Sequence, residues 1–131
     1  IRSARMSIIA LAMELTPAQQ DKFWPIYNSY AREQDNLMAQ RVEMLSGYIE
    51  KGAMLTDAQA EELALDSFAI QRSRIKRREV YYERFAKAVG PVLAARFIQV
   101  DSQISTLLDL EVAGSMPLIM SPAEVEVKDN N

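Results

Sequence analysis

The chain has 131 residues, 49% of them hydrophobic and 25% charged, a balance typical of one folded domain. Its net charge of -3 gives no overall field that would attract nucleic acid, so none is expected as a partner. There is no histidine and no cysteine, the residue types that supply most acid–base, nucleophilic and zinc chemistry. We therefore expect no enzyme activity, no cofactor and no metal. No apolar run approaches the roughly 18–20 residues that cross a bilayer, and no membrane span is expected.

Two helix-start signals divide the chain. The first is Leu15-Thr16-Pro17-Ala18-Gln19, and the second is Leu55-Thr56-Asp57-Ala58-Gln59. In each, the threonine can accept a hydrogen bond from the first helical turn, and the glutamine can reach back to the amide of the threonine. We expect a short helix over residues 3–14, a second from Pro17 to about Lys51, and a third that ends at Val89.

The first two helices show apolar faces at helical spacing. In the first the face is Met6, Ile9 and Met13. In the second it is Phe23, Ile26, Tyr27, Tyr30, Leu37, Met38, Met44, Leu45 and Tyr48. Pro25 lies inside the second helix and lacks the N–H that an interior position requires, so it predicts a kink or a brief break near Asp21–Trp24.

Gly90-Pro91 ends the third helix and opens a fourth, which should run to about Gly114. Its predicted apolar face is Leu93, Phe97, Val100, Ile104, Leu107 and Leu108. Residues 115–131 form a C-terminal tail, either disordered or draped over the domain, and its apolar patch of Met116, Leu118, Ile119 and Met120 should dock somewhere. The expected fold is all-α: a four-helix, hairpin-like domain over residues 1–114 with long kinked helices, followed by a loose tail over 115–131.

The two Leu-Thr-x-x-Gln motifs resemble those of the LTxxQ-motif family of periplasmic stress proteins, of which the chain would be a divergent branch. Leu15, Thr16, Gln19, Leu55, Thr56 and Gln59 carry the resemblance, which spans roughly residues 6–116. It implies a cradle-shaped antiparallel homodimer that binds unfolded or stress-damaged clients in the periplasm without ATP. The alternatives are a regulatory partner of an envelope-stress sensor protein, and a structural helical dimerisation module.

The third helix carries a basic cluster of five residues with no acid among them: Arg72, Arg74, Lys76, Arg77 and Arg78. At about 100° per residue, Leu65, Phe68, Ile75, Tyr82 and Ala86 fall on one face, which is predicted to be the core face. The opposite face holds Leu63, Ile70, Arg74, Arg77, Arg78, Tyr81 and Phe85.

This second face mixes cations with large apolar groups, so it should contact something rather than only water. It could pack on another helix of the same bundle, form a dimer seam, or bind clients. Arginine stems can cover apolar surface while their head groups attract acidic segments, which suits recognition of unfolded chains. The client-binding prediction therefore names Ile70, Arg74, Arg77, Arg78, Tyr81 and Phe85.

Overall fold

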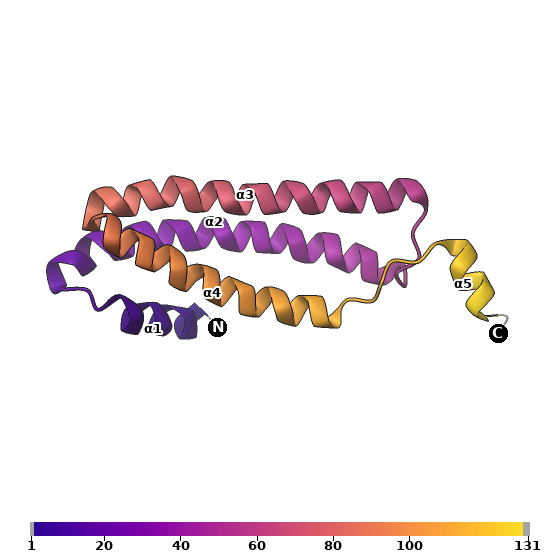
Figure 1. Cartoon of the computed structure of the whole chain (residues 1–131), viewed down its shortest axis with the longest axis horizontal. Coiled ribbons are helices and arrows are strands. Elements are labelled where there is room, and N and C mark those ends of the chain that lie inside the picture. The colour runs from indigo at the N-terminus through magenta and orange to yellow at the C-terminus, as the bar shows by residue number, and fades with distance from the viewer. Residues whose placement is uncertain (1, 130–131) are drawn as a thin grey trace.

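The computed structural model describes residues 2–129, and the side chains of residues 3–124, 126 and 127. In this part of the chain the elements are α1 (Arg2–Met13), α2 (Pro17–Glu50), α3 (Asp57–Val89), α4 (Pro91–Ser115) and α5 (Pro122–Asp129). α2 and α3 form a long antiparallel hairpin, α4 returns along it, and α1 packs against α4 (Figure 1). The all-α class is confirmed. The predicted four-helix domain is confirmed as α1–α4, and part of the predicted tail forms one further short helix, α5.

Both predicted capping boxes are present. Oγ1 of Thr16 accepts a hydrogen bond from the amide of Gln19 at 3.3 Å, and the Gln19 side chain accepts one from the amide of Thr16 at 2.9 Å. Thr56 and Gln59 repeat this arrangement at 3.3 and 3.1 Å. The polar residues of the two motifs thus satisfy amides that the first turn of a helix leaves free, which is a structural role.

Pro25 does not interrupt α2, which is continuous from Pro17 to Glu50. The predicted break is therefore wrong, whereas a bend there stays a prediction. Pro25 and Asp21, four residues earlier, both lie on the exposed side of the helix. Water can therefore hydrogen-bond the carbonyl group that the proline ring leaves without an intrahelical donor.

The main core lies at the end of the hairpin where α3 turns into α4. Its buried residues are Ile9, Met13, Phe23, Tyr27, Tyr30, Ala31, Tyr81, Phe85, Ala94 and Phe97. The ring of Phe97 contacts four other rings of this cluster, with centroid distances from 4.5 Å to Phe85 up to 5.9 Å to Tyr27. The predicted inward faces of α1 and α2 are confirmed here. In α4 the prediction is wrong for Leu107, which is 68% exposed.

A second, much smaller core closes the opposite end of the hairpin. It consists of Tyr48, Ala53 and Leu55, with Met116 from the tail packed against them. Between the two cores, residues 32–47 of α2 and 57–80 of α3 contain no fully buried residue. The middle of the hairpin is thus a thin layer whose side chains are mostly within reach of solvent.

The end of α1 stores backbone strain at Glu14, an exposed residue with φ of 49°. This left-handed conformation is unfavourable for a residue with a Cβ atom and is favourable for glycine just after a helix. We expect Glu14→Gly to raise the free energy of unfolding by about 0.5–1 kcal/mol in urea titrations. Glu14→Ala keeps the Cβ atom and is the matched control, and an equal gain in both variants would show that strain is not the cause.

Candidate functional site

The two faces of α3 are oriented opposite to the prediction. Tyr81 and Phe85, predicted to face a client, are 3% and 0% exposed and belong to the main core. Leu65, Phe68 and Ile75, predicted to form the core face, are 57%, 53% and 55% exposed. Tyr82 and Ala86 are partly buried at the edge of the core. The predicted assignment of inner and outer face is therefore wrong for this helix.

The remaining members of the predicted client-binding face also pack within the chain. Arg74 pairs with Asp109 at 3.3 Å and Arg78 with Asp101 at 3.3 Å, both across to α4. Arg77 lies 3.6 Å from Glu33 of α2. Ile70 is half-buried and lines a hollow together with Arg74, Arg41 and Asp109. The prediction that Ile70, Arg74, Arg77, Arg78, Tyr81 and Phe85 form a client-binding surface is corrected: Tyr81 and Phe85 are buried, Arg74 and Arg78 pair with α4, Ile70 is half-buried, and Arg77 alone of the six is exposed.

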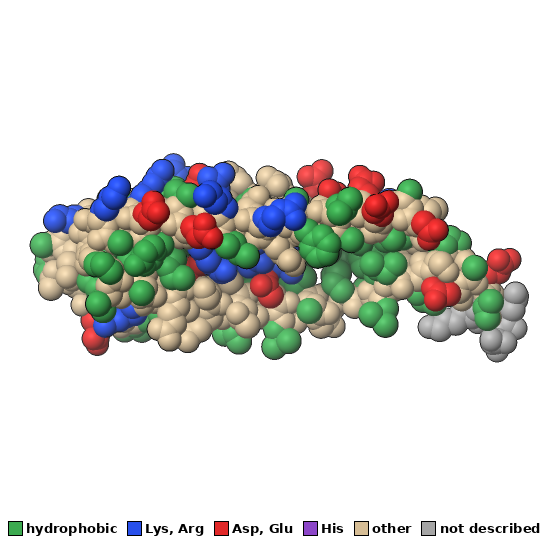
Figure 2. Space-filling view, turned by 45° about the horizontal axis from the view of Figure 1, so that its top comes forward, with side chains coloured by type: hydrophobic (Ala, Val, Ile, Leu, Met, Phe, Trp, Pro, Cys, Tyr) green, Lys and Arg blue, Asp and Glu red, His purple; other side chains and the backbone are tan. Residues whose placement is uncertain are grey.

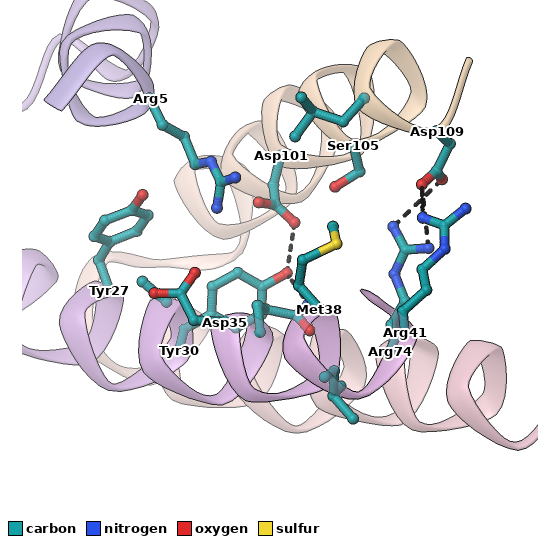
Figure 3. A pocket seen from close by; sticks show the side chains of 14 residues that line it. Arg5, Tyr27, Tyr30, Asp35, Met38, Arg41, Arg74, Asp101, Ser105 and Asp109 are labelled. Atoms are coloured by element: carbon teal, nitrogen blue, oxygen red, sulfur yellow. Dashed lines mark hydrogen bonds and ion pairs between the residues drawn. The ribbon is translucent and has the colours of Figure 1, made fainter. Parts of the chain in front are cut away.

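Asp101 of α4 is the centre of the first polar link between the three long helices (Figure 3). Its Oδ2 accepts hydrogen bonds from the Tyr30 hydroxyl of α2 at 2.5 Å and from Nε of Arg78 at 3.3 Å. Burial of the ring and the neighbouring Asp101 charge raise the pKa of Tyr30 well above its usual value. The phenol therefore stays protonated and acts as a donor.

Asp109, two turns further along α4, forms the second link. It pairs with Arg41 of α2 at 2.6 Å and with Arg74 of α3 (Figure 3). Burial alone disfavours the charged carboxylate, but the hydrogen bond from Arg41 and the charge and hydrogen bond of Arg74 outweigh it and lower the pKa of Asp109. Sequence reasoning missed both aspartates. Each aspartate pairs with arginines of other helices, 23 to 68 residues away in the sequence, so no local pattern on α4 indicated these pairs.

A cavity of about 60 Å³ lies beside these two links, lined by residues of α1, α2, α3 and α4. Figure 3 shows Arg5, Asp35 and Ser105 around it. Such a volume admits a few water molecules and no substrate. Within the described residues, no group of three or more acids is placed to hold a metal ion. The polar links of Asp101 and Asp109 thus serve to join helices.

The surface that stands out is the outward face of α3, where large apolar side chains lie exposed in a row. We call it the outer stripe and define it as Leu65, Phe68, Arg72, Ile75, Glu79 and Tyr82. The intervals between these positions alternate between three and four residues, the spacing of a helix face that packs against another helix. Several exposed large apolar groups on one helix face, here Leu65, Phe68 and Ile75, are typical of an interaction surface.

A shallow groove of about 650 Å³ runs beside the C-terminal half of the outer stripe. Ile75, Tyr82 and Glu83 of α3 contribute to one wall, and Ala95 and Ile98 of α4 form the other. In Figure 2, the charged side chains over this half of α3 are mostly Lys and Arg with a few acidic ones among them, and hydrophobic side chains lie beside them, whereas acidic side chains gather over its N-terminal half. The candidate functional site is therefore an apolar row with a charge gradient along it.

Comparisons with protein-family models, with curated proteins and with solved structures found no match to this chain. The similarity to the LTxxQ-motif family therefore remains a prediction from the two motifs. None of the helices in the described part of the chain is both long and apolar enough to span a membrane.

The pKa of Asp109 leads to a pH-dependent prediction. A carboxyl whose pKa is lowered by folding stabilises the fold above its unfolded-state pKa of about 4, and this contribution disappears as the pH falls through the folded-state pKa. We expect Asp109→Asn to lower the free energy of unfolding by about 0.5–1 kcal/mol at pH 7, a small value because the ion pairs are partly exposed.

Urea titrations of wild type and variant from pH 7 down to pH 2.5 measure this difference, which should shrink below about pH 4. Glu111→Gln, at an exposed acid on the same helix, is the matched control and should change little. A difference that stays constant across the whole pH range would exclude the proposed role of the Asp109 charge.

Proposed function

We propose that this chain is an ATP-independent, chaperone-like binding protein of the periplasm, which holds unfolded or stress-damaged clients against the outer stripe of α3. The observation that carries the proposal is the row formed by Leu65, Phe68 and Ile75, each more than half exposed. Unfolded chains expose apolar side chains at irregular intervals, and a long, shallow apolar row can bind many such arrangements. The periplasm and the independence from ATP rest on the resemblance of the two motifs.

The charges around the outer stripe suit the same role. Arg72 lies within the row, and Lys76 and Arg84 are exposed on the same half of the helix. Their stems add apolar contact area, while their head groups attract acidic segments of a client over a range of about 10 Å at 0.1 M salt. Binding of clients should therefore weaken as salt increases, without being abolished.

The proposal predicts that polar substitutions on the outer stripe remove activity and leave the fold intact. In the triple variant Leu65→Gln, Phe68→Gln and Ile75→Gln, the free energy of unfolding should change by less than about 1 kcal/mol, because these side chains are mostly exposed. The variant should lose most of its ability to suppress light scattering by a heat-unfolded model protein.

The matched control is Leu107→Gln with Leu110→Gln, which removes apolar groups that are 68% and 69% exposed on α4. Equal loss of protection in the control and in the triple variant would mean that general surface hydrophobicity acts, and not the outer stripe. Full protection by the triple variant would reject the outer stripe as the client-binding surface.

A specific observation favours a second candidate, a helical dimerisation module in which α3 pairs with α3 of a second copy. The first third of α3 carries only acids as charged residues, namely Asp57, Glu61, Glu62 and Asp66, and the rest is strongly basic. Antiparallel pairing places each acidic part against the basic part of the partner subunit. Parallel pairing would instead place Arg72 against Arg72 and Glu79 against Glu79, which repel.

Within an antiparallel pair centred near residues 73–74, Arg72 lies about 6 Å along the axis from Glu79 of the partner subunit, within reach of its side chain. Arg72→Glu should therefore weaken the homodimer, and adding Glu79→Arg should restore it. Light scattering at low salt over a protein dilution series measures this. A wild-type chain that is monomeric at tens of micromolar, or a double variant no stronger than the single, contradicts the antiparallel dimer.

A further inference from the structure

The segment after α4 continues toward the end of the hairpin that lies away from the main core, and it docks there on the turn between α2 and α3 (Figure 1). The amide of Met120 donates to the carbonyl of Ala53 at 2.9 Å, and the amide of Leu55 donates to the carbonyl of Met120 at 3.0 Å. The hydroxyl of Tyr48 donates to the carbonyl of Pro117 at 2.5 Å. The tail is thus held as an extended peptide, and the bridge between Met54 and Met120 is parallel.

The α2–α3 turn has an unusual backbone that makes this docking possible. Gly52 and Ala53 are both in the left-handed region, with φ of 62° and 64°, although alanine rarely adopts it. After this turn, the carbonyl of Ala53 and the amide of Leu55 point to the same side and are free of helical hydrogen bonds. With Met54 between them, they present the acceptor and donor pattern of a strand edge.

Most of the recognition of the tail goes through its backbone. All three hydrogen bonds use main-chain groups of the tail, and Met116 is its side chain that packs into the small core. Leu118 is 88% exposed and Ile119 is 50% exposed. A site that holds a peptide by its main chain accepts many sequences, as when a peptide adds a strand to a sheet edge.

A groove of about 330 Å³ continues from this turn between α2 and α3. Tyr48 and Leu55 are shared with the tail site, and Met44 and Leu63 extend it. Its rim carries the acids Glu43, Glu62 and Asp66 and the single base Lys51. The groove has room for apolar side chains of a peptide longer than the tail, and its acids favour basic residues in that peptide.

We propose that the α2–α3 turn and this groove form a docking site for an extended apolar segment of another polypeptide, with a basic residue nearby, and that the C-terminal tail occupies the site as an internal competitor. This rests on the proposed function only in taking the partner to be an unfolded chain. Since the tail is tethered, its effective concentration is in the millimolar range, so it excludes weakly binding peptides and yields to tighter ones.

The test uses the full chain with the tail detached by one substitution. Met120→Pro removes the amide that donates to Ala53, whereas Met120→Leu keeps it and is the matched control. The probe is a fluorescent peptide with the sequence of residues 115–121 preceded by two lysines, and fluorescence anisotropy measures its binding. Circular dichroism and thermal unfolding of each variant check that the helical fold is retained.

We expect the probe to bind the Met120→Pro variant about tenfold more tightly than wild type or Met120→Leu, because the tethered competitor is lost. Adding Tyr48→Phe to the Met120→Pro variant should weaken binding about fivefold, the value of one hydrogen bond. A probe with proline in place of the residue corresponding to Met120 should not bind. Any of three results would overturn the proposal. These are equal binding of the probe to wild type, Met120→Pro and Met120→Leu, no binding to Met120→Pro, or undiminished binding of the proline probe.

Two further measurements distinguish this docking site from a contact between two copies of the chain and from the outer stripe. If wild type is a dimer that Met120→Pro converts to a monomer, the tail of a second copy fills the turn, and an internal competitor is ruled out. The outer-stripe variant Leu65→Gln, Phe68→Gln, Ile75→Gln, combined with Met120→Pro, should still bind the probe. If this combined variant still binds the probe and also still protects clients, the outer stripe is rejected as the client-binding surface and the docking site at the turn is retained. The two proposals can therefore fail independently.

Discussion

Phe97 attaches α4 to the long hairpin, and the arrangement of the other helices depends on this contact. Its ring meets Phe23, Tyr27 and Tyr30 of α2 and Phe85 of α3, so one side chain joins all three helices. Aromatic rings bury large areas and prefer edge-to-face geometry, which fixes the rotation of each helix as well as its distance. Asp101 follows one turn later on the same face and adds the polar contacts to Tyr30 and Arg78.

Concentrating the core at this end leaves the rest of the hairpin with few buried residues, although α4 still reaches it at Asp109. α2 and α3 are each about 50 Å long by the rise of an α-helix, but the buried residues of α2 lie within 23–31 and at Tyr48, and those of α3 are only Tyr81 and Phe85. A two-helix layer cannot bury both faces of either helix. The exposed apolar groups of α3, and the use of the tail to cover the small core at the far turn, both follow from this shortage of covering layers.

The sequence predicts local features of the fold well and the rotation of α3 poorly. Thr16 and Gln19 act on neighbours three residues away, so the start of α2 could be located without tertiary information. The inner face of α3 is decided by Asp101 and Asp109, which lie 23 and 35 residues from their arginine partners. From the sequence of α3 alone, the face with Leu65, Phe68 and Ile75 is the more apolar one, so it was predicted to face the core. The face that does so carries three arginines. A tail draped over the domain was one of two expectations, and its backbone pairing with Ala53 and Leu55 depends on a left-handed turn that no residue pattern indicated.

The two polar links centred on Asp101 and Asp109 also help to explain why the outer stripe is exposed. A rotation of α3 about its axis that buried Leu65, Phe68 and Ile75 would expose Tyr81 and Phe85, which are 3% and 0% exposed, so apolar area gained on one face would be lost on the other. The same rotation would move Arg78 away from Asp101, which is only 6% exposed, and would leave a buried carboxylate without its cation. The free-energy cost of removing one partner from a buried ion pair is larger than the net stabilisation that the intact pair gives. The Arg78–Asp101 pair therefore destabilises the rotated packing more than it stabilises the observed one. The buried rings of Tyr81 and Phe85 and the two aspartates on α4 thus together set which face of α3 is available for binding, although none of them lies on that face.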